Sequence, residues 1–309
     1  MPEPSEGQVL VKTHAASICG SDLHVVCHGV NMPPVPCAHG YPGHEAIGEI
    51  VASSGSDTSA LPVGTNVLCF PPAHIATCFG DYQALGSKYV LPLPECDVTA
   101  AELLMAQQLG TVIFAAKQWG VEVEGRSVMV IGQGSAGLFW ASWLRHCGAA
   151  SIIASDPVAE RRAASAHFGV DTVLDPRSDD IEAALRDLTG PGPDLVVEAV
   201  GTKQTLNDSV NLVRPDGNLM WFGLPDSDQA VPIEFSKFFR KRLRAASTYG
   251  AQDEPSASSF QTALDLISSG AIDVKPLLSQ TFSIEDIDQA IVAANQPFES
   301  GALKVSVTF

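Results

Sequence analysis

A glycine-rich hexad near the middle of the chain, residues 132–137, limits the possible folds more than any other feature. It reads Gly-Gln-Gly-Ser-Ala-Gly, directly follows the short apolar run Ser127 to Ile131, and precedes apolar residues spaced for one face of a helix. Glycines in this spacing also occur in ordinary turns, so the hexad alone is a weak signal. Its position between a strand and a helix is the arrangement used by dinucleotide-binding domains. The hexad therefore predicts a dinucleotide site.

Strand-like and helical segments alternate from the hexad to residue 222. Each predicted strand is short and apolar, and a helical segment separates it from the next. Strands that alternate with helices of this length predict an α/β fold with a parallel, doubly wound sheet. The predicted strands after the first are Ser151–Ser155, Thr172–Leu174, Asp194–Glu198 and Asn218–Phe222.

The segments on either side of this region differ from it. Before it, Gly, Pro and Thr are frequent and the apolar runs, such as Gln8–Lys12 and Ala46–Val51, are short, which predicts a compact β-rich domain. The end of the chain returns to the same β-type sequence pattern. We therefore expect a cofactor domain, residues 106–250, inserted between two parts of the other domain, residues 1–105 and 251–309.

The residues of the hexad have separate predicted roles. Gly132 permits the tight turn, Gly134 lets the backbone approach a pyrophosphate, and Gly137 lets the helix pack closely on the strand. Ser135 and Ala136 begin the helix, where free N–H groups and the positive end of the helix dipole favour phosphate. These five residues form the predicted pyrophosphate site.

Asp156 indicates which dinucleotide is bound. It comes nineteen residues after Gly137, at the end of the second predicted strand. A carboxylate there accepts hydrogen bonds from both hydroxyls of the adenosine ribose and repels a 2′-phosphate, so Asp156 favours NAD over NADP. Arg161 and Arg162 follow on a helix, and we interpret them as surface charges rather than phosphate ligands.

The composition argues against several classes of function. The 309 residues include 18 Lys and Arg against 35 Asp and Glu, and the formal net charge of −17 disfavours a nucleic-acid partner, because phosphates require a basic surface. No apolar run has the length of a membrane span, and no signal-peptide pattern is present. The seven cysteines, an odd number, predict free thiols. We therefore expect a cytoplasmic protein with no nucleic-acid or membrane partner.

Two segments near the N-terminus carry residues of catalytic type. They are Cys-Gly-Ser-Asp-Leu-His at 19–24 and Gly-His-Glu at 43–45. Together with the hexad, in this order and spacing, they resemble the zinc-type medium-chain dehydrogenases, the family of alcohol, sorbitol and threonine dehydrogenases. The likeness runs from about residue 7 to the C-terminus and includes the ending Gly-Ala-Leu-Lys-Val at 301–305. It implies a Rossmann domain inserted in a GroES-like catalytic domain. It also implies NAD-dependent hydride transfer between the nicotinamide and a secondary alcohol or polyol, or the corresponding ketone.

The resemblance implies that Cys19 and His44 are ligands of a catalytic zinc, one per chain. Thiolate and neutral imidazole suit Zn²⁺, and a catalytic site leaves one position for a substrate oxygen. Glu45 stands where the family keeps a carboxylate close to the metal, able to bind it transiently. The family usually completes the site with Cys, Glu or Asp about 25 residues before the first glycine of the hexad, where this chain has Gln107. A neutral amide oxygen is a poorer zinc ligand, so three outcomes stay open: Glu45 supplies the missing anionic ligand, zinc binds weakly, or the site holds none.

The resemblance also assigns residues around the metal and the cofactor. Asp22 orients a ligating histidine through its other ring nitrogen. Ser21 and His24 form a proton relay that leads from the alcohol, by way of the nicotinamide ribose, to solvent. Thr111 packs behind the nicotinamide ring. The other residues that the resemblance assigns to the cofactor site are Val200 and Lys304.

Two further departures from the family carry expectations. The four-cysteine lobe that holds a structural zinc in many relatives is missing, since only Cys69 and Cys78 lie between Leu68 and Tyr89. We therefore expect no structural zinc. The family normally has a further strand or two before Gln8–Lys12, so we expect either that the first sheet lacks an edge strand or that the sequence is shortened at its start.

Two other functions fit parts of the sequence. Gln107 keeps open a metal-independent reductase of the same fold that acts on a conjugated double bond, although Cys19 and His44 argue against it. A nucleotide-binding relative without turnover is the least favoured, because the relay residues are present. The apolar stretch Asn218–Val231, expected near the outer edge of the cofactor sheet, predicts a homodimer or homotetramer, since an apolar edge strand needs a partner.

Overall fold

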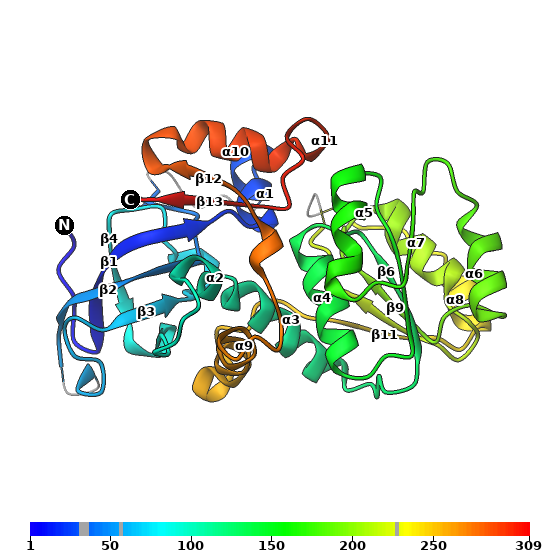
Figure 1. Cartoon of the computed structure of the whole chain (residues 1–309), viewed down its shortest axis with the longest axis horizontal. Coiled ribbons are helices and arrows are strands. Elements are labelled where there is room, and N and C mark those ends of the chain that lie inside the picture. Colours follow the sequence, from blue (N-terminus) through cyan, green and yellow to red (C-terminus); the bar gives the residue numbers. More distant parts are fainter. Residues whose placement is uncertain (31–36, 56–57, 226–228) are drawn as a thin grey trace. The chain divides into compact units, whose positions relative to one another are not determined.

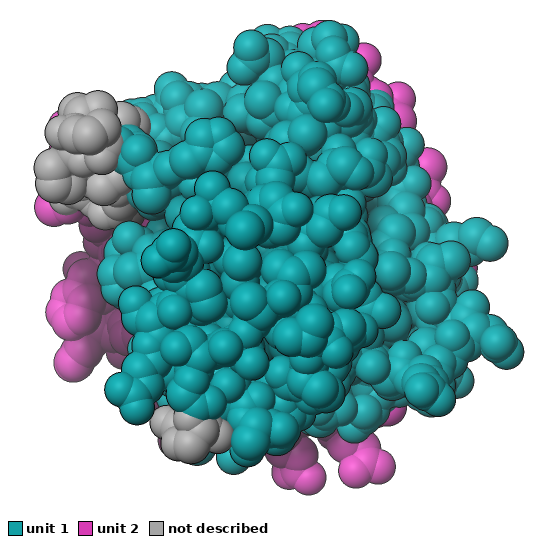
Figure 2. All heavy atoms as spheres, turned by 90° about the vertical axis from the view of Figure 1, so that its left-hand side faces the viewer, with its two compact units in different colours: residues 1–111, 250–296, 302–309 teal, residues 112–249, 297–301 magenta. Residues whose placement is uncertain are grey.

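The computed structural model describes residues 1–30, 37–55, 58–225 and 229–309, which divide into two compact units. Unit 1 comprises residues 1–111, 250–296 and 302–309, and unit 2 comprises residues 112–249 and 297–301 (Figure 2). The chain leaves unit 1, forms nearly all of unit 2 and returns, which confirms the predicted insertion of one domain in the other. The two units meet along the chain at Thr111/Val112 and Tyr249/Gly250. The domain boundaries expected from the sequence, 105/106 and 250/251, stay predictions.

Unit 1 is built on a sheet of seven strands within the described residues (Figure 1). The strand order is β12-β13-β1-β2-β3-β5, with β4 paired to β1, and each pairing is antiparallel except that of β12 with β13. This sheet confirms the β-rich domain. The strands are β1 (Gln8–Ser17), β2 (Ala46–Ser53), β3 (Asn66–Cys69), β4 (Tyr82–Gly86), β5 (Val90–Pro92), β12 (Leu278–Ser283) and β13 (Lys304–Thr308).

The course of β1 places the first catalytic motif. Its register with β2 shifts at two points, so the strand bends. Gly48 of β2 lies so close to it that a Cβ there would come within 2.2 Å of the Lys12 carbonyl oxygen. Just beyond the strand, the N–H of Ile18 donates to the carbonyl of Val305 at 2.9 Å. The backbone is therefore held on β13 immediately before Cys19.

Short helices and 3₁₀ turns connect the strands of unit 1. The longest, α3 (Ala106–Trp119), contains the division between the units, and its residue Leu109 is fully buried. The others are α1 (Gly20–His28), η2 (Ala73–Ile75), η3 (Ser87–Tyr89), α2 (Ala100–Leu104), η5 (Pro255–Ala257), α9 (Ser258–Ser268), η6 (Lys275–Leu277), η7 (Ile284–Asp286) and α10 (Ile287–Asn295).

In its described residues, unit 2 contains a six-stranded sheet in the order β11-β10-β9-β6-β7-β8, with every pairing parallel. The chain order reverses between β6 and β9, which makes this the point where such folds bind their ligands. The doubly wound sheet is confirmed. Its strands are β6 (Ser127–Ile131), β7 (Ser151–Ser155), β8 (Thr172–Leu174), β9 (Leu195–Glu198), β10 (Asn218–Trp221) and β11 (Arg244–Ser247). Its helices are α4 (Ser135–His146), α5 (Ala159–Ser165), η4 (Ala166–Phe168), α6 (Ile181–Thr189), α7 (Lys203–Leu212), α8 (Phe235–Arg240) and α11 (Pro297–Ser300).

The prediction that the stretch beginning at Asn218 lies at the outer edge of the cofactor sheet was wrong. β10 pairs on its outer side with β11, so the apolar run that begins at Asn218 is interior, and Leu219 and Met220 are fully buried. Residues 226–228 of the predicted stretch lie outside the described residues. The sequence of β11, Arg-Ala-Ala-Ser, has no strand pattern of its own, and its pairing with β10 makes it a strand. In the described part of the chain, no helix combines the length and the apolar character needed to cross a bilayer.

Candidate active site

Asp22 connects the two N-terminal motifs. Cys19 is the residue before α1, and its backbone N–H donates to Oδ2 of Asp22 at 2.8 Å. The other carboxylate oxygen, Oδ1, lies 2.8 Å from Nδ1 of His44. Asp22 is only 2% exposed, so both contacts are sheltered from water. One carboxylate thus fixes the backbone of Cys19 and the ring of His44.

The ring of His44 is buried and oriented by its neighbours. Because Nδ1 is held by Asp22, Nε2 is the ring nitrogen left to face Ser21, whose Oγ lies 3.4 Å away. Burial lowers the pKa of His44, but the charge and the hydrogen bond of Asp22, together with Cys19, outweigh it and raise the pKa well above its usual value. The contact between the Asp22 carboxylate and Nδ1 of His44 is the one by which a carboxylate orients a metal-binding histidine.

Glu45 is buried next to His44 and uses its two carboxylate oxygens differently. Oε2 accepts from the Ser17 hydroxyl and lies 2.7 Å from Nζ of Lys304. Oε1 is buried and has no hydrogen-bond partner. Burial raises the pKa of Glu45, but the positive charges of Lys304 and His44 lower it further, so that it falls below its usual value. Glu45 therefore holds a buried carboxylate oxygen with no donor.

Cys19, His44 and Glu45 form a cluster that fits a metal ion. One ligand atom from each lies within 4.8 Å of the other two, and among the described residues this is the group of His, Cys, Asp and Glu side chains with that property. A thiolate, an imidazole nitrogen and a carboxylate oxygen are donors that zinc prefers. The orphaned Oε1 of Glu45 would gain the partner it lacks. The donor set and its burial thus suit a zinc ion.

The hexad forms the predicted turn between β6 and α4. Gly132 has a φ of 91°, and its N–H donates to the carbonyl of Ser155 at 2.8 Å. A Cβ at Gly137 would lie 1.9 Å from the Gly132 carbonyl oxygen, so no other residue fits there without a backbone shift. Gly134 precedes the first residue of α4, Ser135, and Ala136 follows. The N–H groups at the start of α4 therefore belong to the hexad, as a phosphate site requires.

Asp156 has contacts within the protein that the sequence did not predict. It is 2% exposed, and its two carboxylate oxygens accept from the backbone N–H groups of Gln133, at 2.7 Å, and Val158, at 2.8 Å. Each oxygen retains a second lone pair. Asp156 therefore shapes the hexad turn, in addition to any contact with a ribose.

The interpretation of Arg161 and Arg162 as surface charges was wrong. The Arg161 side chain is 22% exposed, and its Nε is buried without a partner. Its guanidinium carbon lies 3.7 Å from the position that a Cβ on Gly134 would take. Arg162 donates to the Asp156 carbonyl at 2.8 Å and pairs with Asp175 at 3.0 Å. Arg161 on α5 thus lies beside Gly134 of the hexad, which spacing along the chain alone did not reveal.

Comparison with known proteins gives the family. Residues 5–100 match the family described as alcohol dehydrogenase GroES-like domain, and residues 136–269 match the one described as zinc-binding dehydrogenase. The chain belongs to the zinc-type medium-chain alcohol dehydrogenase family. It is therefore an enzyme, an oxidoreductase of a zinc-dependent family that uses a nicotinamide cofactor, as the motifs predicted.

Individual relatives resemble the dehydrogenase over nearly its whole length. It is 28% identical to a probable D-xylulose reductase A of Aspergillus clavatus, over 91% of this chain and 85% of the relative. It is 26% identical to sorbitol dehydrogenase of Gallus gallus, over 92% and 85% respectively. A zinc-binding dehydrogenase of Sinorhizobium meliloti, solved with NADP, shares its fold with a TM-score of 0.85 and 24% identity, over 100% of this chain and 94% of that chain.

The structure places four more predicted residues of unit 1 on two helices, α1 and α3. Ser21 and His24 are on α1, and Nδ1 of His24 lies 2.8 Å from the Gly20 carbonyl. Gln107 and Thr111 are one turn apart on α3, where the Thr111 hydroxyl donates to the Gln107 carbonyl at 3.2 Å. Gln107 is 2% exposed. The roles assigned to these four residues stay predictions.

Val200 and Lys304, the last residues assigned to the cofactor, have different surroundings. Val200 follows β9, and a Cβ on Gly132 would lie 2.6 Å from its Cγ2, so it packs directly against the hexad turn. Lys304 instead directs its ammonium group to Glu45 of the candidate metal centre. This pairing joins residues 259 positions apart in the chain, so no local pattern could have revealed it.

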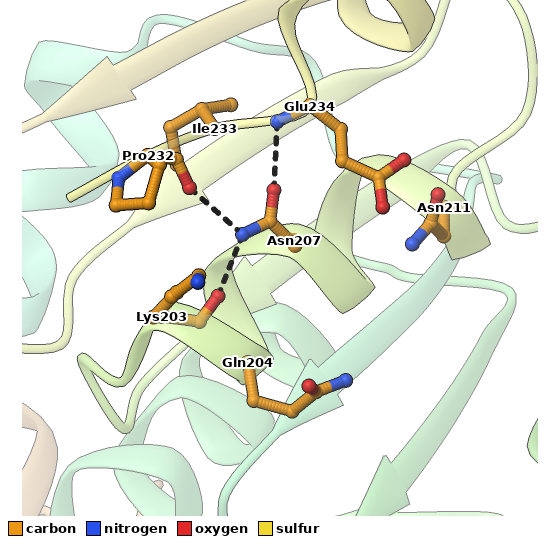
Figure 3. A pocket seen from close by; sticks show the side chains of 7 residues that line it. All are labelled: Lys203, Gln204, Asn207, Asn211, Pro232, Ile233 and Glu234. Atoms are coloured by element: carbon orange, nitrogen blue, oxygen red, sulfur yellow. Dashed lines mark hydrogen bonds between the residues drawn. The ribbon is translucent and has the colours of Figure 1, made fainter.

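A separate hollow on unit 2 carries none of the predicted site residues. It lies along α7 and the segment before α8, and Asn207 is at its centre (Figure 3). The Asn207 amide donates to the carbonyls of Lys203 and Pro232 and accepts from the N–H of Glu234. Its polar atoms therefore join two segments of the fold. The lining residues are Lys203, Gln204, Asn207, Asn211, Pro232, Ile233 and Glu234.

Proposed function

We propose that this enzyme transfers a hydride between NAD and a secondary alcohol or polyol, or the corresponding ketone, with a catalytic zinc at Cys19, His44 and Glu45. The observation that carries the proposal is the buried cluster of these three ligands, with Asp22 hydrogen-bonded behind His44. The buried Oε1 of Glu45, which has no donor in the protein, is an anionic oxygen that a metal ion would satisfy.

The residues around the cluster have distinct tasks in this proposal. Zinc, when bound, polarises the substrate oxygen and favours loss of the hydroxyl proton. Asp22 holds Nδ1 of His44, which leaves Nε2 as the nitrogen that would bind the metal. Ser21 Oγ, 3.4 Å from that nitrogen, accepts the hydroxyl proton as its own proton passes to the nicotinamide ribose. His24, three residues further on α1, takes the proton from the ribose and passes it to solvent.

The cofactor is held by the hexad and by the end of β7. The N–H groups at the start of α4 bind the pyrophosphate, and Arg161 adds positive charge beside Gly134. Asp156 keeps a lone pair on each oxygen for the ribose hydroxyls and repels a 2′-phosphate, which supports NAD as the preferred cofactor. Val200 supports the turn from the β9 side.

The substrate class follows from the relatives and from the chemistry of the site. Relatives named for xylulose and sorbitol act on a polyol or its ketose. A site with one metal and one proton acceptor suits oxidation at a carbon that bears a hydroxyl group. A secondary alcohol or polyol is therefore the proposed substrate.

One observation favours a second candidate, a metal-independent reductase of a conjugated double bond. Gln107, whose amide is a poor zinc ligand, is buried at the position where the family usually has an anionic ligand. Oε1 of Glu45, which is buried and has no hydrogen-bond donor, favours the zinc-dependent enzyme, because it offers the anionic oxygen that Gln107 lacks.

One preparation separates these candidates. Bound zinc and alcohol-dependent reduction of NAD are measured together in the wild type, in Cys19→Ala and in Cys27→Ala, which replaces an exposed cysteine on α1, the helix that follows Cys19. The proposal requires that Cys19→Ala lose both zinc and turnover, while Cys27→Ala keeps both. Undiminished turnover in zinc-free Cys19→Ala protein would favour the reductase.

We further propose a homo-oligomer, a dimer or tetramer, that forms through the outer edge of the unit 2 sheet. Most of β11 is exposed, and nearby α8 exposes Phe235 to 67% and Phe239 to 70%. An open edge with exposed aromatic side chains favours pairing across a two-fold axis. Sedimentation should show an assembly larger than a monomer, and a monomer at working concentration would contradict it. A cytoplasmic location and the absence of nucleic-acid and membrane partners stay predictions.

A further inference from the structure

Lys304 is a buried lysine whose main partner is a predicted metal ligand. Its Nζ lies 2.7 Å from Oε2 of Glu45, and the two side chains are 2% and 1% exposed. Nζ also donates to Oε1 of Gln108 at 3.3 Å. A buried ammonium group is costly unless it is paired and hydrogen-bonded. The position of Lys304 therefore depends on Glu45.

The two carboxylate oxygens of Glu45 differ in their partners within the protein. Oε2 has two donors, the Ser17 hydroxyl and Lys304, whereas Oε1 is buried with none. The backbone of Glu45 is fixed as well, because its carbonyl accepts from the N–H of Ser17 at 3.1 Å. Oε2 is thus engaged by the protein, whereas Oε1 has no donor to compete with a metal ion.

We propose that Lys304 is a positioning residue that competes with the catalytic zinc for the Glu45 carboxylate and keeps Glu45 a weak, releasable ligand. The inference rests on the proposed zinc site. The thiolate of Cys19 and the carboxylate of Glu45 together balance the two charges of Zn²⁺. Lys304 adds a further positive charge in a buried setting, where charges interact more strongly than in water.

Two consequences follow from this competition. Zinc binds less tightly than it would to the same three ligands without Lys304. A carboxylate shared with an ammonium group also leaves the metal readily, which opens a coordination position for the substrate oxygen. Gln107 then need not be a ligand, because the anionic oxygen comes from Glu45.

The test measures zinc affinity rather than activity. Protein stripped by a chelator is titrated with zinc against a chromophoric chelator, in the wild type, Lys304→Met and Lys304→Arg. Lys304→Met should bind zinc at least about tenfold more tightly, a change typical of residues that contact metal ligands. Lys304→Arg retains the charge and should stay near the wild type. Lys12→Met, which removes an exposed lysine of β1, is the matched control and should leave the affinity unchanged.

Two further measurements separate positioning from a general effect on folding. In cobalt-substituted protein, the visible absorption bands should change in Lys304→Met, because Glu45 then binds the metal without competition. When Lys304→Met is combined with Glu45→Gln, the gain in zinc affinity should be smaller, because the Glu45 carboxylate for which Lys304 and zinc compete is absent. Should Lys304→Met fail to fold, Lys304→Gln retains a donor to Glu45 without the charge and should give the same direction of change.

The outcomes are distinguishable. Zinc binding to the wild type, with unchanged or weaker affinity in the foldable neutral variant, would overturn the role of Lys304 alone. If neither the wild type nor Cys19→Ala binds zinc, the proposed zinc site fails, and the role of Lys304 fails with it.

Discussion

The Asp22 carboxylate holds two of the three candidate metal ligands that the first two motifs supply, Cys19 and His44. It accepts from the Cys19 N–H and lies 2.8 Å from Nδ1 of His44. An asparagine has one acceptor oxygen, so it cannot satisfy both groups. We expect Asp22→Asn to lower zinc affinity by about 10- to 100-fold. Competition with a chelator measures this, and Asp97→Asn, an exposed change in unit 1, is the control. Equal zinc affinity in Asp22→Asn and the wild type would show that Asp22 has no part in metal binding.

Glu198 allows a prediction about pH at the end of β9. It is fully buried; Oε1 accepts from the N–H groups of Val200 and Gly201, and Oε2 has no partner. Burial raises its pKa more than these hydrogen bonds lower it. The folded state thus binds this proton more tightly than the unfolded state, so the stabilisation is present at low pH and is lost as the pH rises through the raised pKa.

We therefore expect Glu198→Gln to raise the melting temperature at neutral pH, with a gain that shrinks at acid pH. Thermal unfolding at both pH values measures it, with the exposed change Glu182→Gln on α6 as the control. A variant less stable than the wild type at neutral pH would contradict the assigned direction.

The sequence could predict the chemical types of the site residues but not their pairings. Cys19, His44 and Glu45 were predicted from short motifs, and the structure brings them together. The pairing of Glu45 with Lys304 and the burial of Arg161 depend on tertiary packing, which local spacing does not encode.

At the scale of elements, the turn between β6 and α4 makes different demands on its glycines. At Gly134 a Cβ would find Arg161 at an ordinary 3.7 Å, and its φ of −64° suits alanine. At Gly137 the Cβ would meet the Gly132 carbonyl oxygen at 1.9 Å. Gly134→Ala should therefore fold normally but bind NAD weakly, because the methyl group lies where the pyrophosphate approaches.

Gly137→Ala should lose stability as well, by about 1–3 kcal/mol, because α4 must move away from the strand. Chemical denaturation and NAD titration of both variants measure the difference. If Gly137→Ala were as stable as Gly134→Ala, the close contact would not constrain the turn.

The strands of unit 2 differ in how well the sequence predicts them. β6, β7, β9 and β10 are apolar and buried on both faces, so their composition reveals them. The edge strand β11 has the sequence Arg-Ala-Ala-Ser, and only its pairing with β10 identifies it. The prediction misplaced the edge of the sheet because an edge is a property of the assembled sheet rather than of one segment.

At the scale of the whole molecule, the candidate metal centre depends on segments from both ends of the chain. Cys19 and Glu45 come from the first part of unit 1, whereas Lys304 begins β13 near the C-terminus. β13 pairs with β1, and this pairing brings Lys304 to Glu45. The insertion of unit 2 could be predicted from its alternating strands and helices, but the pairing of β13 with β1 could not be predicted from either segment alone.

The central claim is that zinc at Cys19, His44 and Glu45 supports alcohol oxidation by this enzyme. Its most direct test is a titration of chelator-stripped protein with zinc, in which bound metal and NADH formation from a secondary alcohol are followed in the same sample. The account predicts that stripped protein is inactive and that activity rises in proportion to bound zinc until each chain holds one ion, with no recovery in Cys19→Ala. Full activity in metal-free protein, unaffected by Cys19→Ala, would contradict it.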